Sequence, residues 1–295
     1  MLYVFAGGHR MGSHFQTFVV SHALAQTRRR FQWVDPAAMN TFHLAAIRRA
    51  LAACDAQADK HFIAKAHAAF PSQIDALLSA QTARVFLIWR PQRDCLVSDY
   101  HFAKANAGHS YANFDDYFAR RGRRVLLRNR LQEVVWSTRA DPRVRSWQYL
   151  DLRNDFAHVA GEMLAFAGID GVDLGKLADG LQIDKLRDKY RDPHGRFFRK
   201  GGSDELADLS PSPATMEEIT KIETATDVGA LGRDYLACDR WKMCLFGSEA
   251  EEAGWRKGLQ TWLYRSPRLR KLQRQALPRM RRLSFRRLTQ DAASE

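Results

Sequence analysis

The sequence predicts a single α/β domain with a central, mostly parallel β-sheet that helices cover, followed by a basic helical tail. Two observations favour this class. Short apolar runs alternate with amphipathic segments along the first 150 residues, which is typical of successive βαβ units. Polar and glycine-rich stretches follow several of these runs, where open parallel sheets bind their ligands. With 295 residues and 45% hydrophobic content, the chain can bury the core that such a sheet needs.

The predicted strands are short and rich in β-branched and aromatic residues. They cover residues 2–6, 30–34, 61–66, 84–89 and 144–150. The spacing of apolar residues predicts helices at 13–26, 41–56, 71–81, 113–138 and 155–169. A segment rich in glycine, proline and aspartate, residues 191–215, is interpreted as a long functional loop. We expect the domain to span residues 1–246 and the tail to span 247–295.

Cysteine use and hydropathy exclude several classes of protein. The four cysteines form no C-x-x-C pair, so neither a disulfide framework nor a zinc site is expected. No basic segment followed by an apolar one precedes the first strand, as a signal peptide would require. No apolar run approaches the roughly 18 residues of a membrane span. We therefore expect a soluble cytoplasmic protein that needs no metal.

The net charge of +13 is concentrated in the tail. Residues 255–295 hold twelve Lys or Arg and two acidic residues, which leaves only +3 for residues 1–254. Within the tail, apolar residues with helical spacing form one face and the basic residues form the other. Such a segment suits peripheral contact with the anionic inner face of a membrane. Binding of an anionic polymer and packing onto the domain stay open as alternatives. A nucleic-acid-binding protein is disfavoured because the domain itself is nearly neutral.

A glycine-rich loop, GGHRMGS at residues 7–13, joins the first predicted strand to the first predicted helix. It resembles a nucleotide phosphate loop, but Ser13 and His14 replace the Lys and Ser/Thr that bind the γ-phosphate and Mg²⁺. A small-molecule kinase of that class is therefore disfavoured. The glycines, the helix N-terminus and Arg10 still favour an oxyanion site. On its own, the loop is equally compatible with a glycine-rich turn beside an exposed arginine.

Further polar groups follow the later strands. Strand alternation places Lys65 and His67 on the same side of the third strand end. Arg90 follows the fourth strand, and an arginine that leaves a buried strand favours an anionic partner. Two more motifs come after it in the chain, YLD at 149–151 and FFRKGG at 197–202. Among side chains, only histidine has an unperturbed pKa near neutrality, so His67 is a candidate general base.

Together and in this order, these motifs resemble the PAPS-dependent sulfotransferases, particularly the cytosolic type, over about residues 1–240. Residues 10–15 (RMGSHF) stand where that family has K-S-G-T-T-W, and residues 65–67 (KAH) match its K-T-H. Arg90 is followed eight residues later by Ser98, as in the motif of the family that binds the 3′-phosphate. YLD resembles its Y-E-D, and the segment at 197–201 matches its F-x-R-K-G.

The resemblance implies an enzyme that transfers the sulfuryl group of PAPS (3′-phosphoadenosine 5′-phosphosulfate) in line to an acceptor hydroxyl, releasing PAP without a metal. It implies that Lys65 and Arg10 stabilise the developing charge and that His67 is the general base. The acceptor is expected to be a glycan or a lipid-linked glycan, bound by residues 101–140 and 190–215. The positions implied for the co-substrate are Arg10, Met11, Gly12, Ser13, His14, Phe15, Arg90, Ser98, Tyr149, Arg199, Lys200 and Gly201.

Three departures from the family pattern lie in the first loop. Arg10 replaces the usual lysine and keeps the positive charge as a rigid, always-protonated fork. His14 replaces a hydroxyl residue, which removes one contact to the phosphosulfate, while Phe15 replaces Trp and keeps an aromatic face. These departures leave an alternative open, a protein of the same fold that binds PAP or a polyanion without turnover.

Overall fold

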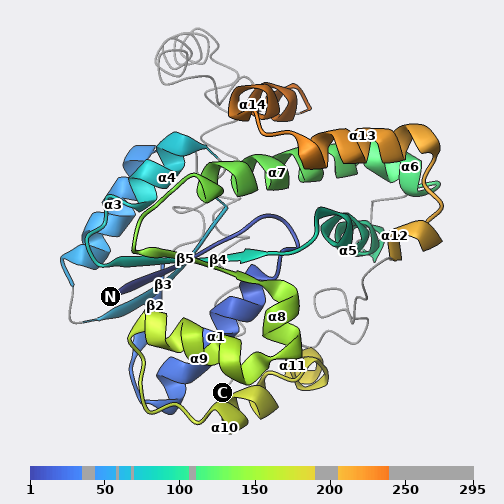
Figure 1. The fold of residues 1–295 in the computed structure, drawn as a ribbon. Coiled ribbons are helices and arrows are strands. Elements are labelled where there is room, and N and C mark those ends of the chain that lie inside the picture. The colour runs from blue at the N-terminus through green and yellow to red at the C-terminus, as the bar shows by residue number, and fades with distance from the viewer. Residues whose placement is uncertain (35–43, 58–59, 68–69, 106–110, 190–204, 239–295) are drawn as a thin grey trace, which may run out of the picture. The chain divides into compact units, whose positions relative to one another are not determined.

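The computed structural model describes residues 1–34, 44–57, 60–67, 70–105, 111–189 and 205–238 (Figure 1). These residues belong to one compact unit, Met1–Cys238. The predicted tail at 247–295 lies outside the described residues, as do Arg199, Lys200 and Gly201. Among the described helices, none has the length and apolar character that a membrane span requires.

Five parallel strands form one sheet in the order β2-β3-β1-β4-β5. Their bounds are β1 (Leu2–Ala6), β2 (Phe31–Trp33), β3 (His61–Ala66), β4 (Ala83–Trp89) and β5 (Val144–Gln148). In the register of the central strand, Ala6 lies opposite Ala66 of β3 and Leu87 of β4. The predicted parallel sheet is therefore confirmed, and the carboxyl ends of its three central strands lie together at one edge.

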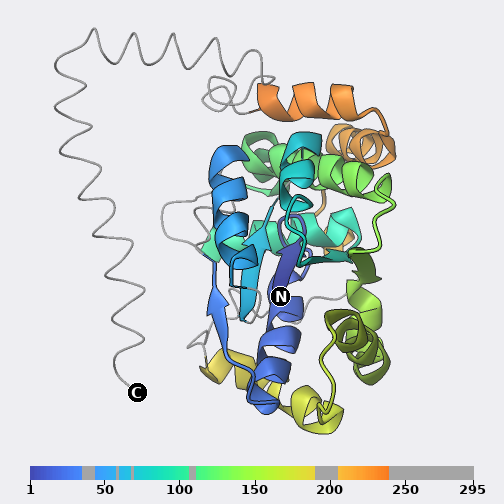
Figure 2. The ribbon, with the colours of Figure 1, turned by 90° about the vertical axis from the view of Figure 1, so that its left-hand side faces the viewer.

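Helices cover both faces of the sheet (Figures 1 and 2). One face is covered by α1 (Ser13–Gln26), α8 (Tyr149–Asn154), α9 (Phe156–Ala167), α10 (Leu174–Gly180) and α11 (Ile183–Lys189). Toward the other face lie α3 (Leu44–Asp55), α4 (Pro71–Leu77), α5 (Gln92–Ala105), α6 (Phe114–Tyr117), the π-helix η1 (Phe118–Gly122), α7 (Arg123–Ser137), α12 (Glu205–Asp208), α13 (Pro213–Thr224) and α14 (Val228–Ala237).

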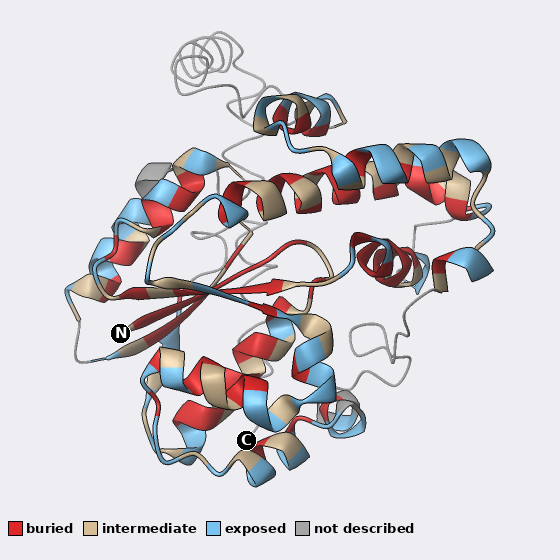
Figure 3. Ribbon diagram, in the orientation of Figure 1, coloured by how far each residue is buried: buried red, intermediate tan, exposed pale blue. Residues whose placement is uncertain are grey.

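The central strand is buried on both faces (Figure 3). Leu2, Val4 and Ala6 pack in the cluster beneath α4, α5 and α7. Tyr3 and Phe5 pack in the opposite cluster with residues of α1 and α9. Because a parallel strand covered on both faces is apolar throughout, β1 shows the continuous hydrophobic run seen in the sequence.

The connections around β1 create a crevice at the carboxyl edge. After β1 the chain enters α1 on one face, whereas the helices that follow β3 and β4 lie on the other face (Figure 1). The loops after neighbouring strands therefore diverge, and this divergence is where open α/β sheets bind their ligands.

Two predicted elements differ from the structure in part. The strand predicted over 144–150 ends at Gln148, and Tyr149 begins α8, in which Leu152 is fully buried and Asp151 lies in the favourable first turn. The loop predicted over 191–215 contains α12 and the start of α13 in its described part. Ser212 caps α13 by accepting from the Thr215 N–H, and Pro213 occupies the first turn. Proline is one of the loop signals of this segment, but Pro and Ser are also typical helix starts.

Candidate active site

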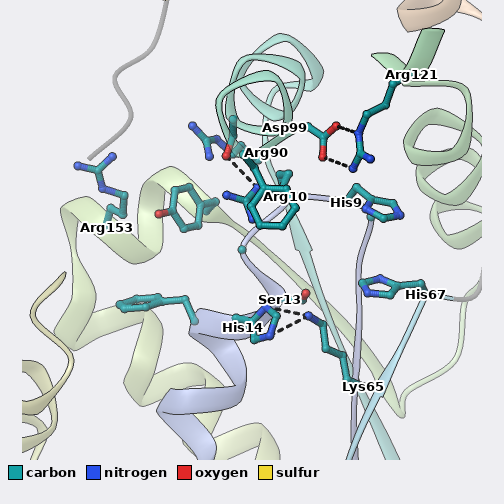
Figure 4. Close-up of a pocket in the computed structure, with 16 residues that line it drawn as sticks. His9, Arg10, Ser13, His14, Lys65, His67, Arg90, Asp99, Arg121 and Arg153 are labelled. Atoms are coloured by element: carbon teal, nitrogen blue, oxygen red, sulfur yellow. Dashed lines mark hydrogen bonds and ion pairs between the residues drawn. The ribbon is translucent and has the colours of Figure 1, made fainter. Parts of the chain in front are cut away.

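A cavity of about 350 Å³ opens at the carboxyl edge of the sheet (Figure 4). The loop between β1 and α1 forms one wall, the ends of β3 and β4 form the floor, and α5, η1 and α8 complete it. Its lining residues are Gly8, His9, Arg10, Gly12, Ser13, His14, Phe15, Lys65, His67, Arg90, Ser98, Asp99, Phe102, Arg121, Tyr149 and Arg153. The excess of Arg and Lys over acidic side chains in this set favours an anionic ligand.

The structure brings almost all of the predicted site residues that it describes to this cavity. Met11 is different, because its side chain is fully buried in the core, where its Sδ accepts the Gly8 N–H at 3.2 Å. The lining includes Phe102 and Arg121 from the segment 101–140, which we expected to help bind the acceptor. The predicted Arg199, Lys200 and Gly201 lie outside the described residues.

Two glycines of the loop are required by their neighbours. A Cβ on Gly8 would overlap the side-chain amide of Asn129 on α7, and a Cβ on Gly12 would lie 2.5 Å from the Tyr149 ring. Gly12 also has a φ of 100°, in the left-handed region that favours glycine. It precedes α1, whose first N–H groups have no partner within the helix and can bind an anion.

Acidic or hydroxyl groups accompany the arginines beside α5. The Arg90 Nε lies 3.5 Å from Asp94 Oδ2, and its guanidinium lies over the Tyr149 ring at 5.1 Å. Arg10 donates from Nε to Ser98 Oγ at 3.1 Å and lies 4.5 Å from the centre of the Phe102 ring. The loop arginine therefore contacts the serine that is predicted to bind the 3′-phosphate.

Asp99 and Arg121 form the shorter of the two described ion pairs of this wall. Arg121 donates from Nε to Asp99 Oδ2 at 2.6 Å and from Nη2 to Oδ1 at 3.0 Å, and the Tyr117 hydroxyl donates to the same carboxylate. The hydrogen bonds to Asp99 raise the pKa of Arg121. Asp99 is 1% exposed, so this paired carboxylate holds η1 against α5 at the rim of the cavity.

At the end of β3, a lysine contacts a histidine. The Lys65 Nζ lies 2.8 Å from His14 Nδ1 and 3.3 Å from its Nε2. Because an ammonium group can only donate, His14 accepts and is neutral. Burial, followed by the charge of Arg10, lowers the pKa of Lys65 to about 8. Burial and the charges of Lys65 and Arg10 lower the pKa of His14 to about 4.

His67 is held in one tautomer. Its Nδ1 lies 2.5 Å from the Gly7 carbonyl oxygen, which can only accept, so Nδ1 carries the proton and Nε2 carries the lone pair. Burial first, and then the charges of Arg128 and Lys65, lower the pKa of His67 to about 3. The residue is therefore neutral at physiological pH and can accept a proton through Nε2.

Sequence analysis missed several residues around this cavity. His9, Asp99, Phe102, Arg121 and Arg153 line it, and Arg128 and Asn129 of α7 contact its loop from behind. The contacts of Arg128 and Asn129 join residues about 120 positions apart, so they leave no local motif. A usable signal was present in the run RRGRRVLLRNR at 120–130, because helical spacing places residues 121, 124 and 128 on one face.

Comparisons with known proteins agree with this fold. The family model of the sulfotransferase domain matches residues 9–208. Among solved structures, mouse sulfotransferase SULT7A1 complexed with PAP is 15% identical, with a TM-score of 0.55 over 79% of this chain and 88% of that one. Retinol dehydratase in a complex with retinol and PAP is 18% identical, with a TM-score of 0.50 over 80% of each chain. A search of curated protein sequences gives no match.

An α/β sheet with a cationic cavity at its carboxyl edge is typical of proteins that bind an anionic group. The family match covers more than half of the chain, and the chain therefore belongs to the sulfotransferase family. The resemblance drawn from the motifs is confirmed at this level.

Proposed function

We propose that this chain binds PAPS in the cavity described above and transfers its sulfuryl group to an acceptor hydroxyl, with His67 as general base. One observation carries the proposal. A neutral histidine whose Nε2 holds the lone pair lies with Lys65, the loop and the N-terminus of α1 in the same cationic cavity. Sulfuryl transfer, like phosphoryl transfer, needs chiefly positioning and stabilisation of charge.

In this mechanism, the Nε2 of His67 takes the proton of the acceptor hydroxyl while the oxygen bonds to sulfur. The bond between sulfur and the bridging oxygen breaks, and PAP leaves with the electron pair. Lys65, Arg10 and the N–H groups of Gly12 and Ser13 stabilise the negative charge that develops on the departing phosphate.

The low pKa of His67 fits this order of events. The charges of Arg128 and Lys65 contribute to that low pKa when the cavity holds no anion. A bound polyanion opposes these charges, so it raises the pKa of His67 toward its ordinary value. The histidine is thus neutral before PAPS binds and becomes a stronger base once PAPS is in place.

The part of the cavity beside α5 and α8 suits the nucleotide portion of PAPS. Arg90 and Ser98 are proposed to bind the 3′-phosphate, together with Arg199, Lys200 and the Gly201 backbone, because a dianion favours several charge-assisted donors. Tyr149 and Phe15 present aromatic rings near these groups and are proposed to contact the adenine.

Glycans and lipid-linked glycans are the acceptors proposed first. The cationic tail predicted at 247–295 supports this order, since it suits contact with an anionic membrane or polymer. A screen with PAPS would compare glycan, lipid-linked glycan and small phenolic or steroid alcohols as acceptors. Sulfation of alcohols without any glycan would contradict this choice of acceptor while leaving sulfuryl transfer intact.

Thermal unfolding with 3′,5′-ADP (PAP), 5′-AMP and ATP, each without metal, tests co-substrate binding. A ligand at about 100 times its Kd stabilises the folded chain by ~2.7 kcal/mol, which raises Tm by several degrees. We expect this shift with PAP and little shift with 5′-AMP. Equal shifts with both nucleotides would contradict the 3′-phosphate site. Binding of PAP without any turnover of PAPS would instead favour the non-catalytic alternative.

A further inference from the structure

The histidine proposed as base is supported from behind by α7. Arg128 donates from Nη2 to the carbonyl oxygen of His67 at 2.9 Å and from Nη1 to the Nε2 of His9 at 2.9 Å. The His9 ring is stacked on the His67 ring, with 5.6 Å between centroids and 9° between planes (Figure 4). One guanidinium therefore holds both the backbone of His67 and the ring that covers it.

The neighbouring residue of α7 fixes the loop itself. Asn129 accepts the His9 N–H on Oδ1 at 2.7 Å and donates from Nδ2 to the His9 carbonyl oxygen at 3.0 Å. The side chain of Asn129 is fully buried. Because the Asn129 amide lies so close, a Cβ on residue 8 would overlap it, and only glycine fits there. The paired hydrogen bonds hold the backbone of His9 and so keep its ring beside the ring of His67.

The surroundings of Arg128 are unusual for a partly buried cation. Its Nε is inaccessible to solvent and has no acceptor among the described residues. Its two described hydrogen bonds go to neutral acceptors, and no described carboxylate forms an ion pair with it. Removing even part of a charged group from water without a carboxylate partner is costly, and such costs are concentrated where a residue serves function rather than stability.

We propose that Arg128 is a positioning residue for His67, acting through the carbonyl oxygen of His67 and through the stacked His9, with Asn129 holding His9 in place. Arg128 does not line the cavity, so it acts on the base and not on the substrate. The inference rests on the proposed role of His67.

Several groups face His67 and His9 and set their charge. Gly7 contributes its carbonyl oxygen, β3 contributes Lys65, and α7 contributes Arg128 to both rings and Arg124 to His9. Arg121 of η1 also acts on His9. Arg128 is the largest of the charged contributors to the lowered pKa of both histidines, after burial. Removing its charge should therefore raise the pH at which His67 is protonated.

Two variants separate the charge of Arg128 from its geometry in the full-length chain. Arg128→Met removes both, whereas Arg128→Lys keeps the charge but cannot span the two acceptors. Arg130→Met is the matched control on the same helix, because Arg130 contacts Ala225 and Glu133 and not the cavity. For each chain we would follow the His67 ring by NMR from about pH 2 to pH 9, a range that includes its pKa of about 3, and measure hydrolysis of PAPS to PAP and sulfate, which needs no added acceptor.

We expect Arg128→Met to raise the titration midpoint of His67 and to slow hydrolysis about 10- to 100-fold, since small misplacement of a reacting group costs that much. The KM for PAPS should change less than twofold. Arg128→Lys should keep the low midpoint and lose part of the rate, and Arg130→Met should match the wild type in both. If Arg128→Met does not fold, Arg128→Lys and His9→Phe carry the test, because either must slow hydrolysis at unchanged KM.

An unchanged His67 midpoint in Arg128→Met, with a rate no lower than that of Arg130→Met, would overturn the positioning role. A wild-type chain that transfers no sulfuryl group, even to water, would contradict the proposed function. The NMR midpoints would in that case still decide whether Arg128 controls His67.

Discussion

The two walls of the cavity use positive charge differently. Beside α5, Arg90 has Asp94 as a partner and Arg121 has Asp99. At the end of β3, the described contacts of Lys65 and Arg128 are to neutral histidines and backbone. The first wall compensates Arg90 and Arg121 before any ligand arrives, whereas the second offers no such carboxylate among the described contacts of Lys65 and Arg128.

This difference indicates that the first wall binds the ligand and that the second wall takes part in the reaction. A compensated arginine stays charged and in place, which suits the binding of a nucleotide phosphate. The lysine and the histidines of the second wall have lowered pKa values, and lowered pKa values are typical of groups that stabilise or transfer charge during a reaction. The following predictions would sharpen this division between the walls or break it.

The largest effect is expected on the uncompensated wall. Lys65→Met should lower the rate of sulfuryl transfer about 10²- to 10³-fold, as removal of one charge-stabilising donor does elsewhere. Lys60→Met is the matched control, because the Lys60 side chain is exposed at the start of β3 and contacts only Gln57 among its described hydrogen bonds. Turnover at saturating PAPS measures the effect, and equal rates for the two variants would contradict the role of Lys65.

Substitutions in the compensated wall should affect the binding of PAP more than the rate of sulfuryl transfer. Arg90→Ala should weaken PAP binding about 10- to 100-fold, since a hydrogen bond to a charged group is worth ~1.5–3 kcal/mol. Calorimetric titration with PAP measures it. Arg93→Ala, in the first turn of the helix that follows Arg90, is the control, because Arg93 pairs with Glu223 and does not line the cavity. If both variants bind PAP as the wild type does, the 3′-phosphate lies elsewhere.

The affinity for PAP should depend on the titration of Lys65. The pKa of Lys65 is about 8 without ligand, and a bound anion raises it, so binding takes up a proton above that pH. Affinity should be steady from pH 6.5 to 8 and should fall up to about tenfold per pH unit above 8. Lys65→Met should remove this fall. A wild-type affinity that stays constant to pH 10 would show that Lys65 remains protonated throughout.

The sequence predicted the layers of the fold better than the walls of the site. The predicted strands at 2–6 and 61–66 and the helix at 13–26 match the observed elements, because apolar periodicity depends on the chain itself. The loop residues and Lys65, His67 and Arg90 could be found since each lies at or just after the end of a strand. Helical spacing indicates only that Arg128 lies on a basic face; its contacts and those of Asn129 could not be predicted, because a helix residue meets a loop about 120 positions away only through tertiary packing.

The smallest expected effect concerns stability in acid. Burial, followed by the charge of Arg128, lowers the pKa of His9 to about 3, against about 6.5 in an unfolded chain. Between these values the unfolded chain binds the proton and the folded chain does not, so stability falls as pH drops below about 6.5. His9→Phe removes this contribution, up to ~1.4 kcal/mol per pH unit. Its Tm should fall less than the wild-type Tm from pH 7 to 5, and parallel curves would show that His9 is not held neutral.

Sulfuryl transfer by His67→Ala tests the central claim most directly. With PAPS and a hydroxyl acceptor from the screen, the variant should lose on the order of 10²- to 10⁴-fold in rate, as the loss of a general base does, while its Kd for PAP stays within a factor of three. His158→Ala, which removes an exposed histidine of α9 outside this cavity, is the control. A His67→Ala rate within tenfold of wild type would contradict the account and assign the base to another group.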